Sequence, residues 1–458
     1  MKSLVLAEKP SVARDIARVL GCHKNISGAI EGSNYIVTWA LGHLVTLADP
    51  EEYDKKFKAW DMSYLPMVPK KWELVVIKQT SKQYHNVKTQ LFRKDVSEII
   101  IATDAGREGE LVARWILDKS GCHKPIRRLW ISSVTDKAIK EGFAHLKDGR
   151  AYNDLYHAAR SRAEADWLVG INATRALTCK YNAQLSCGRV QTPTLSMIAH
   201  REQQIRSFKP EDYYGLRCTT SVTGGSVGTM ASIVTWTWQQ KKSGSLRSFN
   251  KDLITGLDKK LKNQTLTVTD VHTSSKRTPS PGLYDLTELQ RDANKRFGFS
   301  AKETLNIMQS LYEHHKVLTY PRTDSRYIGT DIVPTIKERL KACNIGPYKK
   351  YIPELLKKPL KTSKAFVDDK KVSDHHAIIP TEEYVQMEHM SNNERKIYDL
   401  VVRRFISVLY PAFEYEQTTL KAEAAGETFT AKGKVIKAAG WKAVYADAAS
   451  SGSSASQY

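Results

Sequence analysis

The segment Glu98-Ile-Ile-Ile-Ala102-Thr-Asp104-Ala-Gly-Arg-Glu108-Gly-Glu110 indicates how the first third of the chain folds. Its β-branched run predicts a buried strand, and the polar turn after it leads into a helix expected from about Gly109 to Lys119. The same order occurs at the start of the chain, where Ser3–Ala7 precedes Glu8 and a helical run from Val12 to Leu20. Strands that alternate with helices indicate a mostly parallel sheet.

Carboxylates follow both of these strands. Ligand sites of parallel sheets lie beyond the carboxyl ends of the strands, so we expect Glu8 and Asp104 to be neighbours. Together with Glu108 they form a hard, oxygen-rich set that suits Mg²⁺. Taken alone, the acidic segment is explained equally well as a helix start, where carboxylates offset the helix dipole. Ser11 is the expected N-cap of the first helix, and Gly21 its expected end.

The composition points to a soluble protein with a polyanionic partner. The 458 residues predict roughly three or four domains, and 41% hydrophobic with 26% charged residues is typical of globular chains. Seventy Lys and Arg against 49 Asp and Glu give a net charge of +21, which favours nucleic acid but also fits a solvated basic surface. No apolar run is long enough for a membrane helix, so a cytoplasmic location is expected.

The six cysteines are far apart and form no C-x-x-C pair. This spacing excludes a zinc ribbon within the chain and makes a disulfide framework a poor interpretation. Reduced thiols remain the interpretation that fits.

Changes of pattern along the chain predict its organisation. After the first α/β part come helices, then strands, then helices again, a short return to strands and an Ala/Ser/Gly-rich tail. We expect the boundaries at residues 1–150, 151–212, 213–275, 276–412, 413–445 and 446–458.

Leu318-Thr-Tyr320-Pro-Arg322-Thr-Asp324-Ser325 is the candidate catalytic loop. A phenol has a pKa of about 10, so a tyrosine that attacks phosphorus needs help to lose its proton. Arg322 is close enough in sequence to hold a phosphate while charge builds on its oxygens. For most of the 21 tyrosines, packing in a turn is the simpler interpretation.

Two further segments carry functional residue types. In Ser373-Asp-His375-His376-Ala-Ile-Ile-Pro-Thr381 an imidazole could bind a phosphate oxygen, although the pattern also fits a strand that enters a turn. The expected DNA-binding loop could wrap a sugar-phosphate backbone and consists of Ser186, Cys187, Gly188, Arg189, Val190 and Gln191.

Taken together, these segments resemble the type IA DNA topoisomerases, and within them most resemble the bacterial topoisomerase III group. The resemblance implies an N-terminal Toprim (Rossmann-like) domain, with Glu8 and Asp104-x-x-x-Glu108 as its acidic residues, followed by the family's ring-type core. Ser186–Pro193, Tyr320–Ser325 and His375–Thr381 resemble further family segments, and Arg175 fits a family helix near DNA. The fold class expected is therefore multidomain, with α/β, α and β parts.

The resemblance also implies roles. Tyr320 forms a 5′-phosphotyrosine in single-stranded DNA, Arg322 and His375 act at the phosphate, and Glu8 with Lys9 handles the proton of the leaving 3′-oxygen. Glu8, Asp104 and Glu108 hold Mg²⁺. Neither ATP nor a membrane is involved, the expected location is nucleoid-associated, and protein partners are not indicated.

Two departures from the family pattern modify these expectations. Gly106 replaces the middle carboxylate of Asp-x-Asp-x-Glu, so one Mg²⁺ is expected rather than two, with Glu110 as a weak substitute. The residues after Tyr445 do not resemble the family's continuation, so the core is expected to be incomplete at its C-terminus. A fragment that binds or cleaves single strands without completing relaxation therefore remains an alternative, as does a Toprim primase or nuclease.

Overall fold

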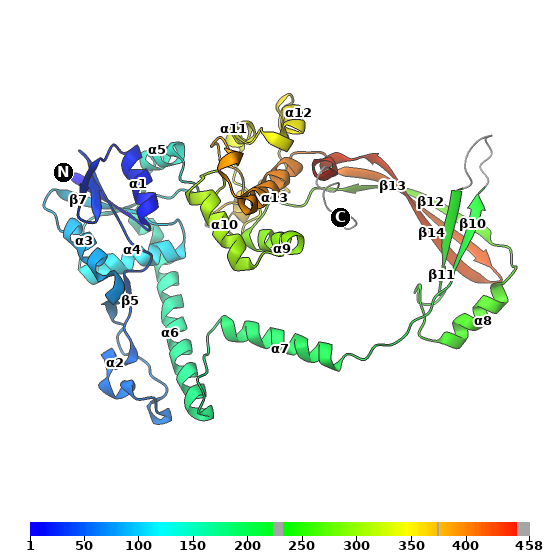
Figure 1. Ribbon diagram of the computed structural model, residues 1–458, viewed down its shortest axis with the longest axis horizontal. Coiled ribbons are helices and arrows are strands. Elements are labelled where there is room, and N and C mark those ends of the chain that lie inside the picture. The colour runs from blue at the N-terminus through cyan, green and yellow to red at the C-terminus, as the bar shows by residue number, and fades with distance from the viewer. Residues whose placement is uncertain (223–231, 373–374, 447–458) are drawn as a thin grey trace. The chain divides into compact units, whose positions relative to one another are not determined.

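The computed structural model describes residues 1–222, 232–372 and 375–446 (Figure 1). The chain divides into two compact units, one made of Met1–Ala199 with Gly282–Ile406 and the other of His200–Pro281 with Ser407–Tyr458. The six finer boundaries expected from the sequence stay predictions. The expected tail lies, after Ala446, outside the described residues.

A seven-stranded sheet organises the first 150 residues, in the order β2-β3-β4-β1-β7-β8-β9. Its four central strands are parallel neighbours, which confirms the expected mostly parallel sheet. The strands are β1 (Lys2–Ala7), β2 (Lys24–Ile26), β3 (Ala29–Glu31), β4 (Tyr35–Trp39), β7 (Val96–Ala102), β8 (Ile126–Arg128) and β9 (Lys147–Asp148). A separate pair is formed by β5 (Val45–Leu47) and β6 (Leu74–Val76).

Both faces of this sheet are covered, which explains why its central strands are apolar throughout. Leu4 and Leu6 of β1 point into one core, where helical side chains including Val87 and Trp115 join them. Val5 and Ala7 point into the core on the other face. The helices of this part are α1 (Pro10–Val19), α2 (Pro50–Tyr53), α3 (Ser81–Leu91), α4 (Arg107–Ser120) and α5 (Asp136–Ala144).

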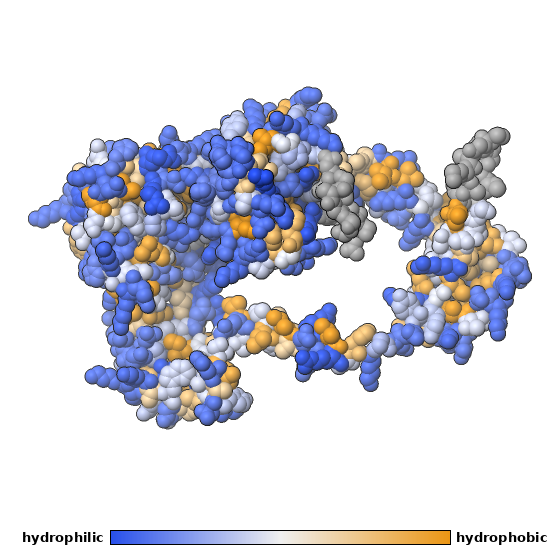
Figure 2. All heavy atoms as spheres, viewed as in Figure 1, coloured by the Kyte–Doolittle hydropathy of each residue, from blue (hydrophilic) through white to orange (hydrophobic). Residues whose placement is uncertain are grey.

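Helices make up the rest of the first unit. Two helices cover residues 286–313, because Gly298 adopts a φ of 73° that ends the first. Apolar side chains of α7, among them Leu195, Met197 and Ile198, are exposed (Figure 2). The helices are α6 (Asn153–Tyr181), α7 (Gln191–Ser207, which runs into the second unit), α9 (Leu286–Phe297), α10 (Ala301–Glu313), α11 (Ile336–Ala342), α12 (Ile352–Leu356) and α13 (Asn392–Val408).

The second unit is built on an antiparallel sheet in the order β10-β11-β14-β13-β12. Trp236 and Trp238 of β11 pack with Ile254 and Leu257 of a single covering helix. The elements are β10 (Arg217–Val222), β11 (Ser232–Gln239), α8 (Lys251–Leu261), β12 (Thr267–Thr278), β13 (Phe413–Ala424) and β14 (Glu427–Ala438).

Some local expectations were wrong. The first helix begins at Pro10 with Lys9 as its N-cap, so Ser11 lies inside the first turn, because proline is well suited to the first helical position. The strand character expected up to Tyr445 ends at Ala438, and Gly440–Tyr445 forms a 3₁₀ helix that buries Trp441 and Val444.

Within the described ranges, no helix is both long enough and apolar enough to cross a membrane.

Candidate active site

The Tyr320 and His375 segments, expected separately from the sequence, lie side by side. Thr319 N donates to the Ile379 carbonyl at 3.0 Å, and Ala377 N donates to the Tyr327 carbonyl at 2.8 Å. An isolated bridge between Leu318 and Pro380 continues the pairing. Two loops without regular strands are thereby fixed against each other by backbone hydrogen bonds.

The Tyr320 loop also rests on the seven-stranded sheet domain. Tyr320 N donates to the Ser132 carbonyl at 3.0 Å, and its phenol donates to Asp104 Oδ2 at 3.3 Å. The ring stacks on His375 with centroids 4.2 Å apart and meets Tyr312 edge-on at 5.4 Å. The tyrosine predicted as the nucleophile is therefore held at Asp104, one of the acidic residues singled out in the sequence.

Glu8 and Asp104 are neighbours, as the ends of two adjacent parallel strands predicted. Glu8 Oε2 accepts a hydrogen bond from Asp104 N at 3.1 Å. Burial, and next the charge of Asp104, raise the pKa of Glu8 to about 7. Burial also raises the pKa of Asp104. Two carboxyl groups that share a buried site resist double ionisation, so a cation or a proton is favoured between them.

The same carboxylates act on the Tyr320 phenol. Its pKa is raised, first by burial and then by the charges of Asp104 and Glu8, while Arg322 opposes this shift. Arg322 is exposed. The cation expected to help deprotonation is thus present, but burial and the two carboxylates outweigh its effect on the pKa of Tyr320.

A buried ion-pair network supports the backbone of Asp104. Arg128 is fully buried and donates to the carbonyls of Asp104 and Thr103 at 2.7 and 2.8 Å. Glu110, equally buried, accepts from Arg128 and Arg114, both at 2.9 Å. The suggestion that Glu110 could replace the missing metal carboxylate is therefore wrong, because both of its oxygens are committed to guanidinium groups.

Gly109 explains part of the acidic motif. A Cβ at this position would lie 2.1 Å from the Asp104 carbonyl oxygen, so a side chain cannot be accommodated. The close approach lets Thr103 Oγ1 donate to the Gly109 carbonyl at 2.7 Å. This glycine packs the start of α4 against the end of β7.

Glu8 and Asp104 fit Mg²⁺ as hard oxygen ligands whose pKa values are both raised by burial, but Glu108 does not join them. Its carboxylate lies 3.6 Å from Arg162 and 3.9 Å from His43, and its side chain is 55% exposed. Among the described residues, no group of three or more His, Cys, Asp or Glu side chains is placed to hold a metal ion. The structure brings together two of the three predicted ligands.

His375 has an unusual environment. The residue is 3% exposed, and Nδ1 lies 3.2 Å from Ser132 Oγ. Nε2 is buried and has no hydrogen-bond partner among the described residues. Burial, followed by the charge of His376, lowers the pKa of His375 to about 4, so the ring is neutral at pH 7.

Lys9 lies beside the carboxylates, as its position after Glu8 predicted. Its Nζ is paired with Glu313 Oε1 at the end of α10. The charge of Lys9 lowers the pKa of Asp104 and that of Glu8. Lys9 therefore partly offsets the repulsion between these two carboxylates.

The predicted DNA-binding loop is open to solvent. Ser186, Arg189, Val190 and Gln191 are exposed, while Cys187 and Gly188 are half-buried. The loop is anchored to α6, because Cys187 N donates to Thr174 Oγ1 at 2.9 Å and Arg189 Nε donates to Asp166 at 2.6 Å.

Arg175, predicted to contact DNA, is buried. Its Nη1 donates to the carbonyl of Phe57, and its guanidinium lies 5.1 Å from the centroid of Trp60. This placement favours a role in holding the Phe57–Trp60 segment over the direct DNA contact expected from the sequence.

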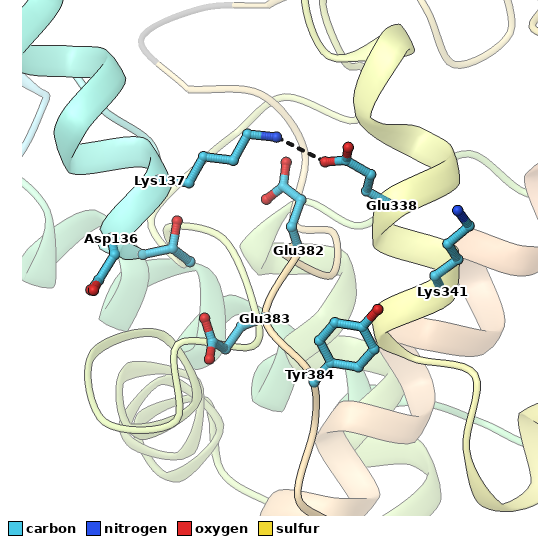
Figure 3. A pocket seen from close by; sticks show the side chains of 8 residues that line it. Asp136, Lys137, Glu338, Lys341, Glu382, Glu383 and Tyr384 are labelled. Carbon is cyan, nitrogen blue, oxygen red and sulfur yellow. Dashed lines mark hydrogen bonds and ion pairs between the residues drawn. The ribbon is translucent and has the colours of Figure 1, made fainter.

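A cavity of about 480 Å³ opens between α5 and α11 (Figure 3). Its acidic side chains are largely paired, Asp136 with Arg18, Glu338 with Lys137 and Glu382 with Arg339. None of the residues around Tyr320 lines it, so it is not part of the candidate active site. It is lined by Thr135, Asp136, Lys137, Glu338, Lys341, Glu382, Glu383 and Tyr384.

Sequence reasoning missed three residues of the site, Arg128, Ser132 and Glu313. Arg128 and Ser132 lie at and just after β8, at the same edge of the sheet as Glu8 and Asp104. The rule about strand ends could have found them if β8 had been recognised, but its three residues are too short to show a period. Nothing in the sequence marks Glu313.

Comparisons with known proteins identify the family of the chain and a similar fold. A family model described as "DNA topoisomerase" matches residues 150–456, and a Toprim domain model matches residues 3–134. The solved structure of full-length topoisomerase I from Thermotoga maritima is similar in fold, with a TM-score of 0.68 at 23% identity, over 97% of this chain and 67% of that chain.

Relatives of known name are closer in sequence. DNA topoisomerase 3 of Bacillus cereus (strain ATCC 14579) is 63% identical over 444 residues, which is 97% of this chain and 59% of that protein. DNA topoisomerase 3 of Bacillus subtilis (strain 168) is 60% identical over 444 residues, covering 60% of its length. The chain thus spans about three fifths of the length of these relatives. The family match over more than half of the chain, together with the Tyr320 site, shows that the chain belongs to the type IA DNA topoisomerases.

Proposed function

We propose that this chain breaks one strand of DNA and rejoins it through Tyr320. The phenol oxygen attacks a phosphodiester, the P–O bond to the 3′-oxygen breaks, and a 5′-phosphotyrosine forms beside a free 3′-hydroxyl. The bond energy is retained in the adduct, so ATP is not required. The observation that carries this proposal is the hydrogen bond from the Tyr320 phenol to Asp104, at the strand end that it shares with Glu8.

Proton transfer is the proposed task of the carboxylates. Tyr320 must lose a proton as it attacks, and Asp104 is the acceptor within hydrogen-bond distance. Glu8, with a pKa of about 7, can give a proton to the leaving 3′-oxygen and take it back during rejoining near neutral pH. Lys9 adds positive charge beside these groups.

Arg322 and His375 are the proposed phosphate ligands. Arg322 is exposed yet close enough to influence the Tyr320 phenol, so it can meet a phosphate that reaches this ring. The unpartnered Nε2 of His375 is a second group for that phosphate. Both would stabilise charge that develops on the non-bridging oxygens.

Mg²⁺ is the proposed cofactor, held by Glu8 and Asp104. When bound it would supply positive charge near the 3′ end of the broken strand. Gly106→Asp tests the one-ion proposal, because a Cβ at this position has nothing within 4 Å. Calorimetric titration of the protein with Mg²⁺ should show tighter binding for the variant, and an unchanged titration contradicts the idea that Gly106 limits metal binding.

Single-stranded DNA is the proposed substrate, with the Ser186–Gln191 loop as a backbone contact. Passage of a second strand, and hence relaxation or decatenation, is a further requirement, and the chain spans about three fifths of its relatives. A plasmid relaxation assay beside an oligonucleotide cleavage assay separates the two activities. Cleavage without relaxation supports the alternative of a chain that cleaves but does not complete strand passage.

The nucleophile assignment is tested by Tyr320→Phe. The wild-type chain is denatured during reaction with an oligonucleotide labelled at its 5′ or its 3′ end. The protein should carry only the 3′ label, because the fragment with the 5′-phosphate stays joined to Tyr320. Tyr320→Phe should form no adduct, whereas Tyr327→Phe, which loses a phenol that accepts from Lys371 in the same segment, should keep it. An adduct that persists in Tyr320→Phe overturns the proposal.

A further inference from the structure

We propose that Ser132 is a positioning residue for strand cleavage, because its hydroxyl orients His375 so that Nε2–H faces the bound phosphate. This inference rests on the proposed function of Tyr320 and adds a residue that none of the sequence motifs contains. Ser132 does not touch the reacting atoms itself. It acts through the nucleophile's backbone and through the imidazole.

Ser132 touches both catalytic segments from the Toprim side. Its carbonyl accepts from Tyr320 N at 3.0 Å, and its Oγ lies 3.2 Å from His375 Nδ1. His375 and Tyr320 are in turn stacked on each other with centroids 4.2 Å apart. One residue of the loop between β8 and α5 therefore fixes the tyrosine backbone and the histidine ring together.

Trp130 restricts the same ring further. Its indole lies nearly parallel to the His375 imidazole, with centroids 6.3 Å apart and planes at 16°. It is itself stacked on Tyr152 at 4.8 Å, and Arg128 lies 5.1 Å from its centroid. The imidazole thus has little freedom to flip, and the two ends of the ring keep distinct neighbours.

The hydrogen bond at Nδ1 determines where the imidazole proton lies. The neutral ring has one N–H, and a serine hydroxyl can either donate to or accept from Nδ1. When Ser132 donates, the proton is on Nε2, and that nitrogen makes no hydrogen bond of good geometry among the described residues, although the backbone of Ala105 is near enough to raise the pKa of the ring. A buried N–H without an acceptor is costly, so the arrangement is suited to receive one from outside.

A phosphate oxygen is the acceptor that fits this position. Nε2–H can donate to it without a proton transfer, and the bond strengthens as negative charge grows on the oxygen during attack by Tyr320. The opposite tautomer would present a lone pair to the phosphate and would give no stabilisation to the charge that builds on it during attack. Ser132 therefore affects the rate of cleavage more than the affinity for DNA.

Single-turnover cleavage of a labelled oligonucleotide by the full chain tests this role. Ser132→Ala should form the adduct about tenfold more slowly, with DNA affinity within about twofold of wild type, because a tenfold loss corresponds to one lost hydrogen bond. Ser132→Thr keeps the hydroxyl and should restore the rate. Ser133→Ala, which removes a neighbouring buried hydroxyl, is the matched control and should cleave like wild type.

A second measurement does not depend on cleavage. In ¹⁵N-histidine-labelled protein without DNA, the ring shifts of His375 should show the proton on Nε2 in wild type and Ser132→Thr, and a mixture of tautomers in Ser132→Ala. Melting temperatures identify any variant that fails to fold.

The two proposals can fail separately. Loss of the adduct in Tyr320→Phe together with wild-type cleavage by Ser132→Ala overturns the positioning role alone. A proton found on Nδ1 in wild type overturns it as well. An adduct that persists in Tyr320→Phe overturns the nucleophile, while the ring shifts still decide whether Ser132 orients His375.

Discussion

The Tyr320 loop and the Ser186–Gln191 loop were both expected to be functional, yet they differ in how firmly they are held and how far they are exposed. The Tyr320 loop is bonded to Ser132 and Asp104 before any ligand arrives. The Ser186–Gln191 loop is anchored to α6 through Cys187 and Arg189, yet it presents Ser186, Arg189, Val190 and Gln191 to solvent. A prebuilt site suits chemistry, which needs fixed geometry, whereas an open loop suits reversible binding of a flexible polyanion.

This contrast predicts that substitutions around Tyr320 cost stability, whereas substitutions in the open loop cost only affinity. Four tests follow, beginning with the largest expected effect.

Removing the carboxylate of Glu110 should lower the free energy of unfolding more than any of the substitutions that follow. Glu110→Ala leaves the guanidinium of Arg128 buried without its carboxylate, and a buried pair that loses one partner costs about 3–5 kcal/mol. Urea unfolding monitored by circular dichroism gives this number. Glu108→Ala, two residues away with a 55% exposed side chain, is the control and should change stability by less than about 0.5 kcal/mol. Equal effects of the two variants would show that the buried network does not stabilise the site.

The second prediction concerns pH and His376. Burial lowers the pKa of His376 to about 4 in the folded chain, against about 6.5 when unfolded. Between these pH values the unfolded chain binds a proton that the folded ring refuses, so the free energy of unfolding falls as pH drops from 6.5 towards 4. The His376 ring should lower the free energy of unfolding at pH 5 by about 2 kcal/mol relative to pH 7.5.

The variant His376→Asn keeps a donor for the Ala377 carbonyl but does not titrate. Glu8 acts in the opposite direction, because its raised pKa favours the folded state as pH falls through 7. The difference between variant and wild type isolates His376. Parallel stability curves over pH 4–7.5 would contradict the prediction.

The third test compares two ion pairs that join the Toprim side to the Tyr320 side. Lys316 and Asp15 are 2.6 Å apart with side chains about 19% and 22% exposed, whereas Lys137 and Glu338 are 2.8 Å apart and 49% and 56% exposed (Figure 3). Double-mutant cycles in unfolding should give a coupling of about 1 kcal/mol for the first pair and about 0–0.5 kcal/mol for the second. The opposite ranking would mean that burial does not decide the strength of these pairs.

The smallest effect on stability is expected for Arg189→Ala in the open loop. Its partner Asp166 is exposed too, so stability should change by less than about 0.5 kcal/mol. Its affinity for an oligonucleotide should fall, and the slope of log affinity against log salt should lessen by about 0.7–1. Arg150→Ala, an exposed arginine paired with Asp148, should leave the slope unchanged. Identical slopes for wild type and Arg189→Ala would remove this residue from the DNA-binding surface.

Much of the fold was readable from the sequence because it depends on local patterns. The β-branched run before Ala102 and the apolar run before Glu8 gave adjacent parallel strands, and this placed Glu8 and Asp104 together. The helix start at Pro10 and the 3₁₀ helix at Gly440–Tyr445 were mispredicted, because turn chemistry and packing of Trp441 outweighed the local pattern there.

The roles of individual polar residues were less readable. Glu108 and Glu110 are two residues apart and therefore about 200° apart around α4. One faces Arg162 and His43 near solvent, and the other is enclosed with Arg128. Arg175 is a second case in which the sequence did not predict burial. It was expected at DNA, but it is buried against the Phe57–Trp60 segment. No residue type indicates by itself which side of its helix will be covered.

By itself the sequence determined which chemical groups are available: a phenol followed by an arginine, carboxylates at strand ends, a histidine pair and an open Gly-Arg loop. These follow from residue identity and from short-range periodicity. Only the tertiary structure decided that Tyr320 meets Asp104 across 216 positions of chain, that Ser132 joins both catalytic segments, and that Glu110 is withdrawn from any metal. Burial and pairing over such separations depend on how whole elements pack. The residues next to a side chain in the sequence therefore do not indicate which distant residue it will contact.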